Sequence, residues 1–137
     1  LLFQWRDMCA DVEILLIRGN HDLKSGDPWP ELSIKCLPEP FEMEKWACRH
    51  HPLENDNFPY LAGHIHPGYR MRGTGRGAIR DACFWVRKDS IVLPAFGSFT
   101  GLKNIMPSPL EDIYLTNNEE IVKVVTQKNL RKNRQQS

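Results

Sequence analysis

The chain has 137 residues, of which 41% are hydrophobic and 26% are charged, and its formal net charge is +1. This length and composition are typical of one soluble globular domain with a core of its own. The small net charge excludes a global field for nucleic acids or membranes, and no apolar run approaches the length of a membrane span. Four widely spaced cysteines without a Cys-x-x-Cys pair argue against a zinc ribbon and suit reduced thiols, so we expect a cytoplasmic protein.

Apolar periodicity defines the predicted elements in chain order. A helix is predicted over 1–9 and a strand over 13–18. The apolar side of this helix would consist of Leu2, Phe3, Trp5 and Met8. Further strands are predicted over 32–37, 41–49, 58–62, 69–72, 82–87, 91–93, 113–115 and 121–125, separated by Gly- and Pro-rich loops that include 24–30 and 94–102. One helix followed by many strands predicts a single domain of the α/β or α+β class.

Two hairpins and a tail complete the predicted organisation. The glycine-rich segment 73–77 predicts a hairpin after the strand over 69–72, and Asn117-Asn118 predicts a terminal hairpin. Residues 1–126 would form the domain. The basic tail 127–137 is expected to fray.

The most informative stretch is 15–22, where an apolar run ends at a glycine and three polar side chains follow at once. Gly19 would let the chain turn where a Cβ would be in the way. Asn20 offers an amide oxygen, His21 an imidazole and Asp22 a carboxylate, and α/β folds place catalytic groups of this kind at strand ends. An ordinary turn is the competing interpretation, since Gly-Asn is common in turns.

All five histidines of the chain follow predicted strand ends: His21, His50, His51, His64 and His66. In the segment 63–66, Gly-His-Ile-His, an extended backbone would point both imidazoles to one face and Ile65 toward the core. Gly63 would leave room for a close approach of the backbone. Two exposed loop histidines are the competing interpretation of this motif.

This donor set favours a pair of transition-metal ions used for hydrolysis. Imidazole suits Zn, Fe, Mn, Co and Ni, and oxygen ligands suit the harder ions. Ser-His-Asp catalysis is a weak competitor, because no Gly-x-Ser-x-Gly elbow occurs. The glycines of 73–77 follow a hairpin strand and open no predicted helix, which excludes a phosphate-binding loop there.

Three ordered motifs resemble those of the calcineurin-like metallophosphoesterases: Gly19-Asn20-His21-Asp22, His50-His51-Pro52 and Gly63-His64-Ile65-His66. The later stretches 83–85 (Cys-Phe-Trp) and 93–101 are similar to the DNA-ligase-associated subfamily of bacteria. The resemblance covers residues 12–115. It implies a β-sandwich flanked by helices, with two metal ions at the strand ends.

The resemblance also implies a ligand set. Asn20, His50 and His64 would ligate one metal ion and His66 the other. His50 is preferred to His51 because the ligand usually lies directly at the strand end, which leaves His51 beside the ligands or exposed. The ions are expected to be Mn²⁺, with Zn²⁺, Fe and Ni²⁺ as the alternatives.

The implied reaction is hydrolysis of a phosphoester. His21 would donate a proton or stabilise charge at the scissile phosphate, and Asp22 would orient His21. The resemblance further implies a phosphodiester substrate such as nucleic acid, and association with an ATP-dependent DNA ligase system in DNA repair.

The sequence departs from the family pattern in one respect. The family also uses an upstream Asp-x-His motif and a Gly-Asp motif whose Asp bridges the two metals, and neither precedes Asn20 here. The chain is therefore expected to be the C-terminal part of a single metallophosphoesterase domain with half of a metal site. An inactive fragment or a non-catalytic binding module is the alternative to an enzyme.

A group of arginines follows the last of these motifs and could hold phosphates: Arg70, Arg72, Arg76 and Arg80. We expect the face that carries them to border the metal cleft. The competing interpretation is a solvated hairpin.

Overall fold

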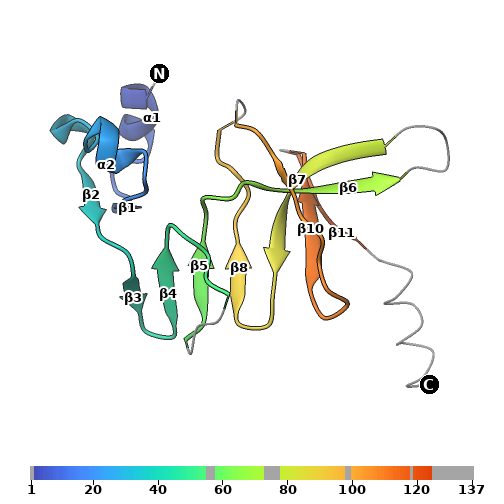
Figure 1. Ribbon diagram of the computed structural model, residues 1–137. Helices are drawn as coiled ribbons and strands as arrows, with labels where there is room; N and C mark the ends of the chain where they lie inside the picture. Colours follow the sequence, from blue (N-terminus) through green and yellow to red (C-terminus); the bar gives the residue numbers. More distant parts are fainter. Residues whose placement is uncertain (1, 55–57, 73–77, 98–99, 118, 125–137) are drawn as a thin grey trace.

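The computed structural model describes residues 2–54, 58–72, 78–97, 100–117 and 119–124. The fold is mixed α+β and mostly sheet, which agrees with the predicted class. Figure 1 shows one broad twisted sheet, with a smaller unit of short helices and two strands beside one of its edges. No helix in the described ranges is long and apolar enough to cross a membrane. The predicted tail 127–137 and the predicted turn 73–77 lie outside the described residues.

The smaller unit is built from the first third of the chain. It contains α1 (Leu2–Met8), β1 (Ile14–Ile17), the short helix α2 (Asp22–Ser25), the 3-10 turn η1 (Pro30–Leu32) and β2 (Ile34–Leu37). Strands β1 and β2 pair in parallel, with Ile14 opposite Ile34. The predicted first helix and the predicted strands over 13–18 and 32–37 are thus confirmed.

The apolar side of α1 is not buried in a core. None of its residues is buried, and Met8 is 85% exposed. Phe3 is 41% exposed and its ring lies 5.6 Å from the ring of Trp29, which is itself 66% exposed. Helical periodicity was sufficient to predict α1, but not to show what it packs against.

The large sheet contains the remaining strands. Along its main path the order is β11-β10-β7-β8-β5-β4-β3, and β6 and β9 extend it beside β7. The bounds are β3 (Phe41–Met43), β4 (Trp46–Arg49), β5 (Tyr60–Ala62), β6 (Pro67–Arg72), β7 (Ala78–Val86), β8 (Ser90–Val92), β9 (Lys103–Asn104), β10 (Asp112–Thr116) and β11 (Ile121–Lys123). Strands β4, β5 and β8 are parallel neighbours, and the other pairs on the path are antiparallel.

Strand β7 belongs to two parts of the sheet. Its first half pairs with β6, and its second half pairs with β10 and β8. The β6–β7 hairpin therefore leaves the plane of the other strands, near the end of the sheet where β4 and β5 finish (Figure 1). Both predicted hairpins are confirmed by the antiparallel pairing of β6 with β7 and of β10 with β11.

One sequence-based prediction in this region was wrong, and one strand was missed. The predicted strand over 41–49 is a hairpin of β3 and β4, because the chain reverses at Glu44, which adopts a φ of 33°. Strand β9 was not predicted at all. It has two residues and exists through its pairing with β6, which no local pattern encodes.

Two apolar clusters hold the sheet together. One is formed by Cys83, Ile105, Ile113 and Leu115, and Ile65 packs against it as predicted. The other is formed by Ala47, Tyr60 and Ala62 on the parallel strands β4 and β5. Since this second cluster lies directly below the ends of β4 and β5, it fixes the points from which the motif histidines emerge.

Candidate metal centre

Parallel pairing brings two of the three motifs together. In the register of β4 and β5, Arg49 lies opposite Ala62, so both strands end at the same edge of the sheet. The residues that follow them, beginning with His50 and Gly63, therefore leave the sheet side by side. The third motif follows β1 and reaches the same place from the smaller unit.

Three donor atoms converge where these segments meet. His50 Nε2 lies 2.8 Å from Asn20 Oδ1 and 2.9 Å from His64 Nδ1. Each of these atoms is a possible metal ligand, and one ion could contact the three atoms after small movements of the side chains. One ring nitrogen from each of His50, His51 and His64 also lies within 4.8 Å of the others, so this cluster could bind a metal ion. The structure therefore brings Asn20, His50 and His64 together.

Gly19 makes room for the His50 ring. A Cβ built on Gly19 would lie 2.4 Å from ring atoms of His50, a separation that real side chains essentially never show. The expectation that a Cβ would be in the way at Gly19 is confirmed. The same expectation for Gly63 was wrong, because a Cβ there would meet nothing within 4 Å.

The motif Gly-His-Ile-His is not extended, contrary to the prediction. Strand β5 ends at Ala62, and His64 and His66 have φ values of 67° and 49°, in the left-handed region that non-glycine residues rarely adopt. Such strained residues concentrate at functional sites, where the surrounding structure over-determines them. Tight bends at His64 and His66 thus place both imidazoles at this end of the sheet, and the alternation of side chains along a strand does not.

His66 is separate from the three converging donors. Its Nδ1 lies 3.3 Å from the carbonyl oxygen of Gly101, in the loop before β9. It is near enough to His64 to help lower the pKa of that residue electrostatically. The role of His66 as a ligand of a second ion stays a prediction.

The pKa values of His50 and His64 are both shifted downward. Burial lowers the pKa of His50, and the nearby His51 and His64 lower it further. Burial also lowers the pKa of His64, with smaller contributions from His51, His66 and His21. A lowered pKa favours the unprotonated imidazole, which is the form that can ligate a metal ion.

His21 and Asp22 lie beside this group at the start of α2. His21 is exposed and occupies the N-cap position of that helix. We expected Asp22 to orient His21, but its Oδ2 accepts a 2.8 Å hydrogen bond from the Gly19 amide. Asp22 thereby closes the turn that positions Asn20 and Gly19, and within the described residues no hydrogen bond runs from the His21 ring to the Asp22 carboxylate.

Glu39 is the residue that sequence reasoning missed. It lies between β2 and β3, and its carboxylate accepts hydrogen bonds from the backbone amides of both His50 and His51. Burial acts to raise its pKa, but these bonds and the His51 ring outweigh burial and lower it. A carboxylate followed by proline in a loop carries no pattern that points to residues eleven and twelve positions away.

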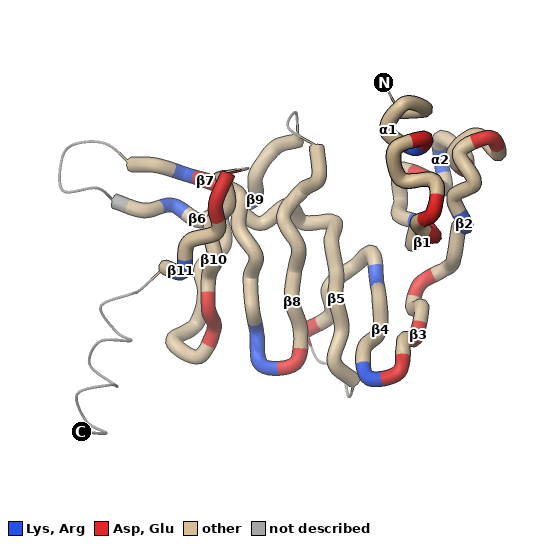
Figure 2. Tube along the Cα trace, turned by 180° about the vertical axis from the view of Figure 1, so that it is seen from behind, with Lys and Arg blue, Asp and Glu red and all other residues tan. Residues whose placement is uncertain are grey.

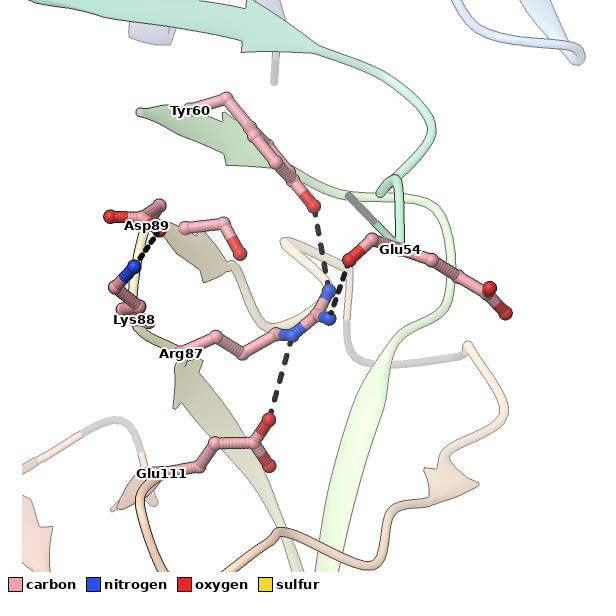
Figure 3. Close-up of a pocket in the computed structure, with 7 residues that line it drawn as sticks. Glu54, Tyr60, Arg87, Lys88, Asp89 and Glu111 are labelled. Atoms are coloured by element: carbon pink, nitrogen blue, oxygen red, sulfur yellow. Dashed lines mark hydrogen bonds and ion pairs between the residues drawn. The ribbon is translucent and has the colours of Figure 1, made fainter. Parts of the chain in front are cut away.

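A pocket of about 250 Å³ lies at the opposite end of the parallel strands, where β5 and β8 begin. Figure 3 shows Arg87 at its centre. The guanidinium donates to the carbonyl oxygens of Leu53 and Glu54, at 2.9 and 3.3 Å, and pairs with Glu111 at 3.6 Å. The hydrogen bonds and the ion pair of Arg87 are thus made within the chain, and they hold Leu53 and Glu54 in place before β5. The histidines therefore remain the candidate site.

Of the four arginines predicted to hold phosphates, two are fully described by the structure, both on the β6–β7 hairpin. Arg70 and Arg80 are exposed and lie directly opposite each other across the two strands. Figure 2 shows basic residues on both arms of this hairpin. The side chain of Arg72 and all of Arg76 lie outside the described part of the chain.

Comparison with known proteins shows a similarity to a solved structure. No protein-family model matches the chain, and no curated protein matches its sequence. The crystal structure of the Pseudomonas putida nuclease MPE does match, with a TM-score of 0.76 and 36% sequence identity over 90% of this chain. The chain is similar to a nuclease. It spans 59% of the length of that nuclease.

Proposed function

We propose that this chain belongs to a metal-dependent phosphoester hydrolase, a phosphodiesterase of the calcineurin-like type that acts on nucleic acid. The observation that carries the proposal is the convergence of Asn20, His50 and His64 within hydrogen-bond distance at the end of parallel strands. The similarity in fold and sequence to a nuclease supports it. Because the chain spans 59% of that nuclease, the activity is proposed for the whole protein.

The proposed division of labour follows the positions of the side chains. Asn20, His50 and His64 would hold one divalent ion, for which Mn²⁺ is our first choice. His66 would contribute to a second ion. Such ions supply Lewis-acid stabilisation of a phosphoryl group and an activated water. His21, exposed beside them, would donate a proton to the leaving oxygen, a role in which an imidazole is effective near neutral pH.

Nucleic acid is the proposed substrate because of the β6–β7 hairpin. Two arginines placed directly opposite each other repel, so Arg70 and Arg80 gain from an anion that bridges them. Strand β6 begins at Pro67, immediately after His66, and a strand advances about 3.3 Å per residue. A phosphodiester backbone that leaves the metal centre along β6 would reach Arg70 after roughly 10 Å, or two to three nucleotides. A cytoplasmic bacterial enzyme of DNA repair that works with an ATP-dependent DNA ligase would fit this substrate.

A non-catalytic module that binds a single metal ion is the second candidate. In the described part of the chain this cluster consists of three histidines together with the amide of Asn20, and no carboxylate is among these ligand atoms. Two divalent ions at a separation of about 3.5–4 Å need bridging anionic ligands to offset their charge. We therefore expect this chain alone to bind one ion weakly and to show no detectable hydrolysis of a generic phosphodiester. In the proposed enzyme, carboxylates from outside residues 1–126 complete the centre.

The proposal is tested by titrating the metal-free chain with Mn²⁺ and following the free ion by electron paramagnetic resonance. We expect one ion per chain, and a loss of affinity of at least about tenfold in Asn20→Ala. Asn104→Ala, on the exposed strand β9, is the matched control and should bind as the wild type does. Equal affinities in the wild type and Asn20→Ala would refute the site. Full hydrolysis by this chain would show that a carboxylate such as Asp22 bridges two ions.

A further inference from the structure

One carboxylate holds both members of the tandem histidine pair. Glu39 Oε2 accepts hydrogen bonds from the His50 amide at 2.7 Å and from the His51 amide at 2.9 Å. Its other oxygen, Oε1, lies 2.6 Å from His51 Nδ1. Three bonds from one side chain fix the backbone at the point where β4 ends and the direction of one ring.

These bonds also decide which ring nitrogen of His51 is available to ligate a metal ion. A carboxylate only accepts hydrogen bonds, so His51 Nδ1 must be the donor toward Glu39. In the neutral imidazole the lone pair then resides on Nε2. A carboxylate on one ring nitrogen, with the other nitrogen free, is the arrangement that typically orients a histidine toward a metal ion.

The ring of His51 faces the proposed centre. Its centroid lies 4.6 Å from that of His50 and 4.4 Å from that of His64. The side chain is 46% exposed, while that of Glu39 is 27% exposed. Glu39 is thus the less accessible partner behind a ring that stands at the edge of the site.

We propose that Glu39 is a positioning residue of the metal centre, which anchors His50 through its amide and turns the Nε2 lone pair of His51 toward the ion. The proposal rests on the proposed function, because it assumes an ion among Asn20, His50 and His64. It adds a residue from the β2–β3 loop and a role for the second histidine of the pair.

The test combines two readouts on Glu39→Gln. In the metal-free chain labelled with ¹⁵N-histidine, long-range ¹H–¹⁵N spectra report which nitrogen of His51 carries the proton. The glutamine oxygen can still accept the two amide hydrogens, but its NH₂ group would then face His51 Nδ1. We expect His51 to change to the Nε2–H tautomer, and Mn²⁺ affinity to fall by about 10–100-fold, as loss of such partners typically costs.

Two further variants make the result decisive. Glu42→Gln, an exposed glutamate on β3, should change neither readout. His51→Ala removes an exposed ring, which the fold should tolerate, and we expect it to lower Mn²⁺ affinity as well. An unchanged Mn²⁺ affinity together with an unchanged His51 tautomer in Glu39→Gln would overturn the inference about Glu39 and leave the proposed metal centre standing. A fall in melting temperature with both readouts unchanged would also overturn it, because Glu39 would then be merely structural. A wild-type chain that binds no Mn²⁺ would refute the metal centre and this inference together.

Discussion

Substituting Gly19 by alanine should disturb the proposed metal centre without replacing any of its proposed ligands. The added Cβ would lie 2.4 Å from the His50 ring, where contacts shorter than 3.0 Å force something to move. Ordinary van der Waals contact begins at 3.4 Å, so the ring or the loop must shift by about 1 Å. The ring is the easier group to move, because Gly19 is buried and its amide is bonded to Asp22.

A displacement of this size should be visible in binding. His50 Nε2 is within 2.9 Å of both partner donors, so a shift of about 1 Å takes it out of the shared position. A misplacement of about 1 Å in an active centre can cost about 100-fold, and overpacking costs about 1–3 kcal/mol of stability. We expect Mn²⁺ affinity to fall by about 10–100-fold in Gly19→Ala, measured by titration of the metal-free chain.

The matched control is Gly63→Ala, in the motif Gly63-His64-Ile65-His66. A Cβ at Gly63 meets nothing within 4 Å, and Gly63 does not have a positive φ. Its Mn²⁺ affinity should equal that of the wild type. If Gly19→Ala also binds Mn²⁺ as the wild type does, while remaining folded, the reasoning that the His50 ring is held at this position for a metal ion is wrong.

Three further predictions concern catalysis, substrate and pH. In the whole protein, His21→Ala should lower turnover by about 10²–10⁴-fold while the metal content is retained, as assayed by turnover and metal analysis side by side; equal losses of both would make His21 a ligand. In Arg70→Gln and Arg80→Gln, the slope of log affinity for single-stranded DNA against log salt should fall by about 1 each, and an unchanged slope would remove the hairpin from the substrate path. Because the folded chain lowers the pKa values of His50 and His64 below 6.5, the unfolded chain binds protons first as pH falls. The melting temperature of the metal-free chain should therefore drop as pH falls below 6.5, whereas a constant value between pH 7 and 5 would contradict the downward shift of these two pKa values.

Local sequence patterns were sufficient to predict the elements whose apolar residues are regularly spaced. The strand before Gly19, the two hairpins and the placement of histidines after strands β4 and β5 all follow from periodicity and turn residues. The convergence of Asn20 with His50 was expected from the resemblance to metallophosphoesterases, and not from spacing. Nothing within residues 13–22 indicates which part of the sheet they will meet.

The parts that were missed depend on long-range contacts or on strain. Glu39 binds the His50 and His51 amides across a hairpin, and β9 exists through its pairing with β6. The left-handed φ angles of His64 and His66 oppose local preference, so a reading of Gly-His-Ile-His as extended was natural and wrong. Such violations of local rules are expected at functional sites, where the fold as a whole sets the geometry.

The central claim is that Asn20, His50 and His64 share one metal ion, and anomalous diffraction tests it most directly. Crystals of the chain soaked in Mn²⁺ and measured on both sides of the manganese absorption edge would locate the ion without reference to activity. We predict a peak within about 2.0–2.4 Å of Asn20 Oδ1, His50 Nε2 and His64 Nδ1. A peak elsewhere, for example between Glu39 and His51, or no peak at saturating Mn²⁺, would contradict the claim.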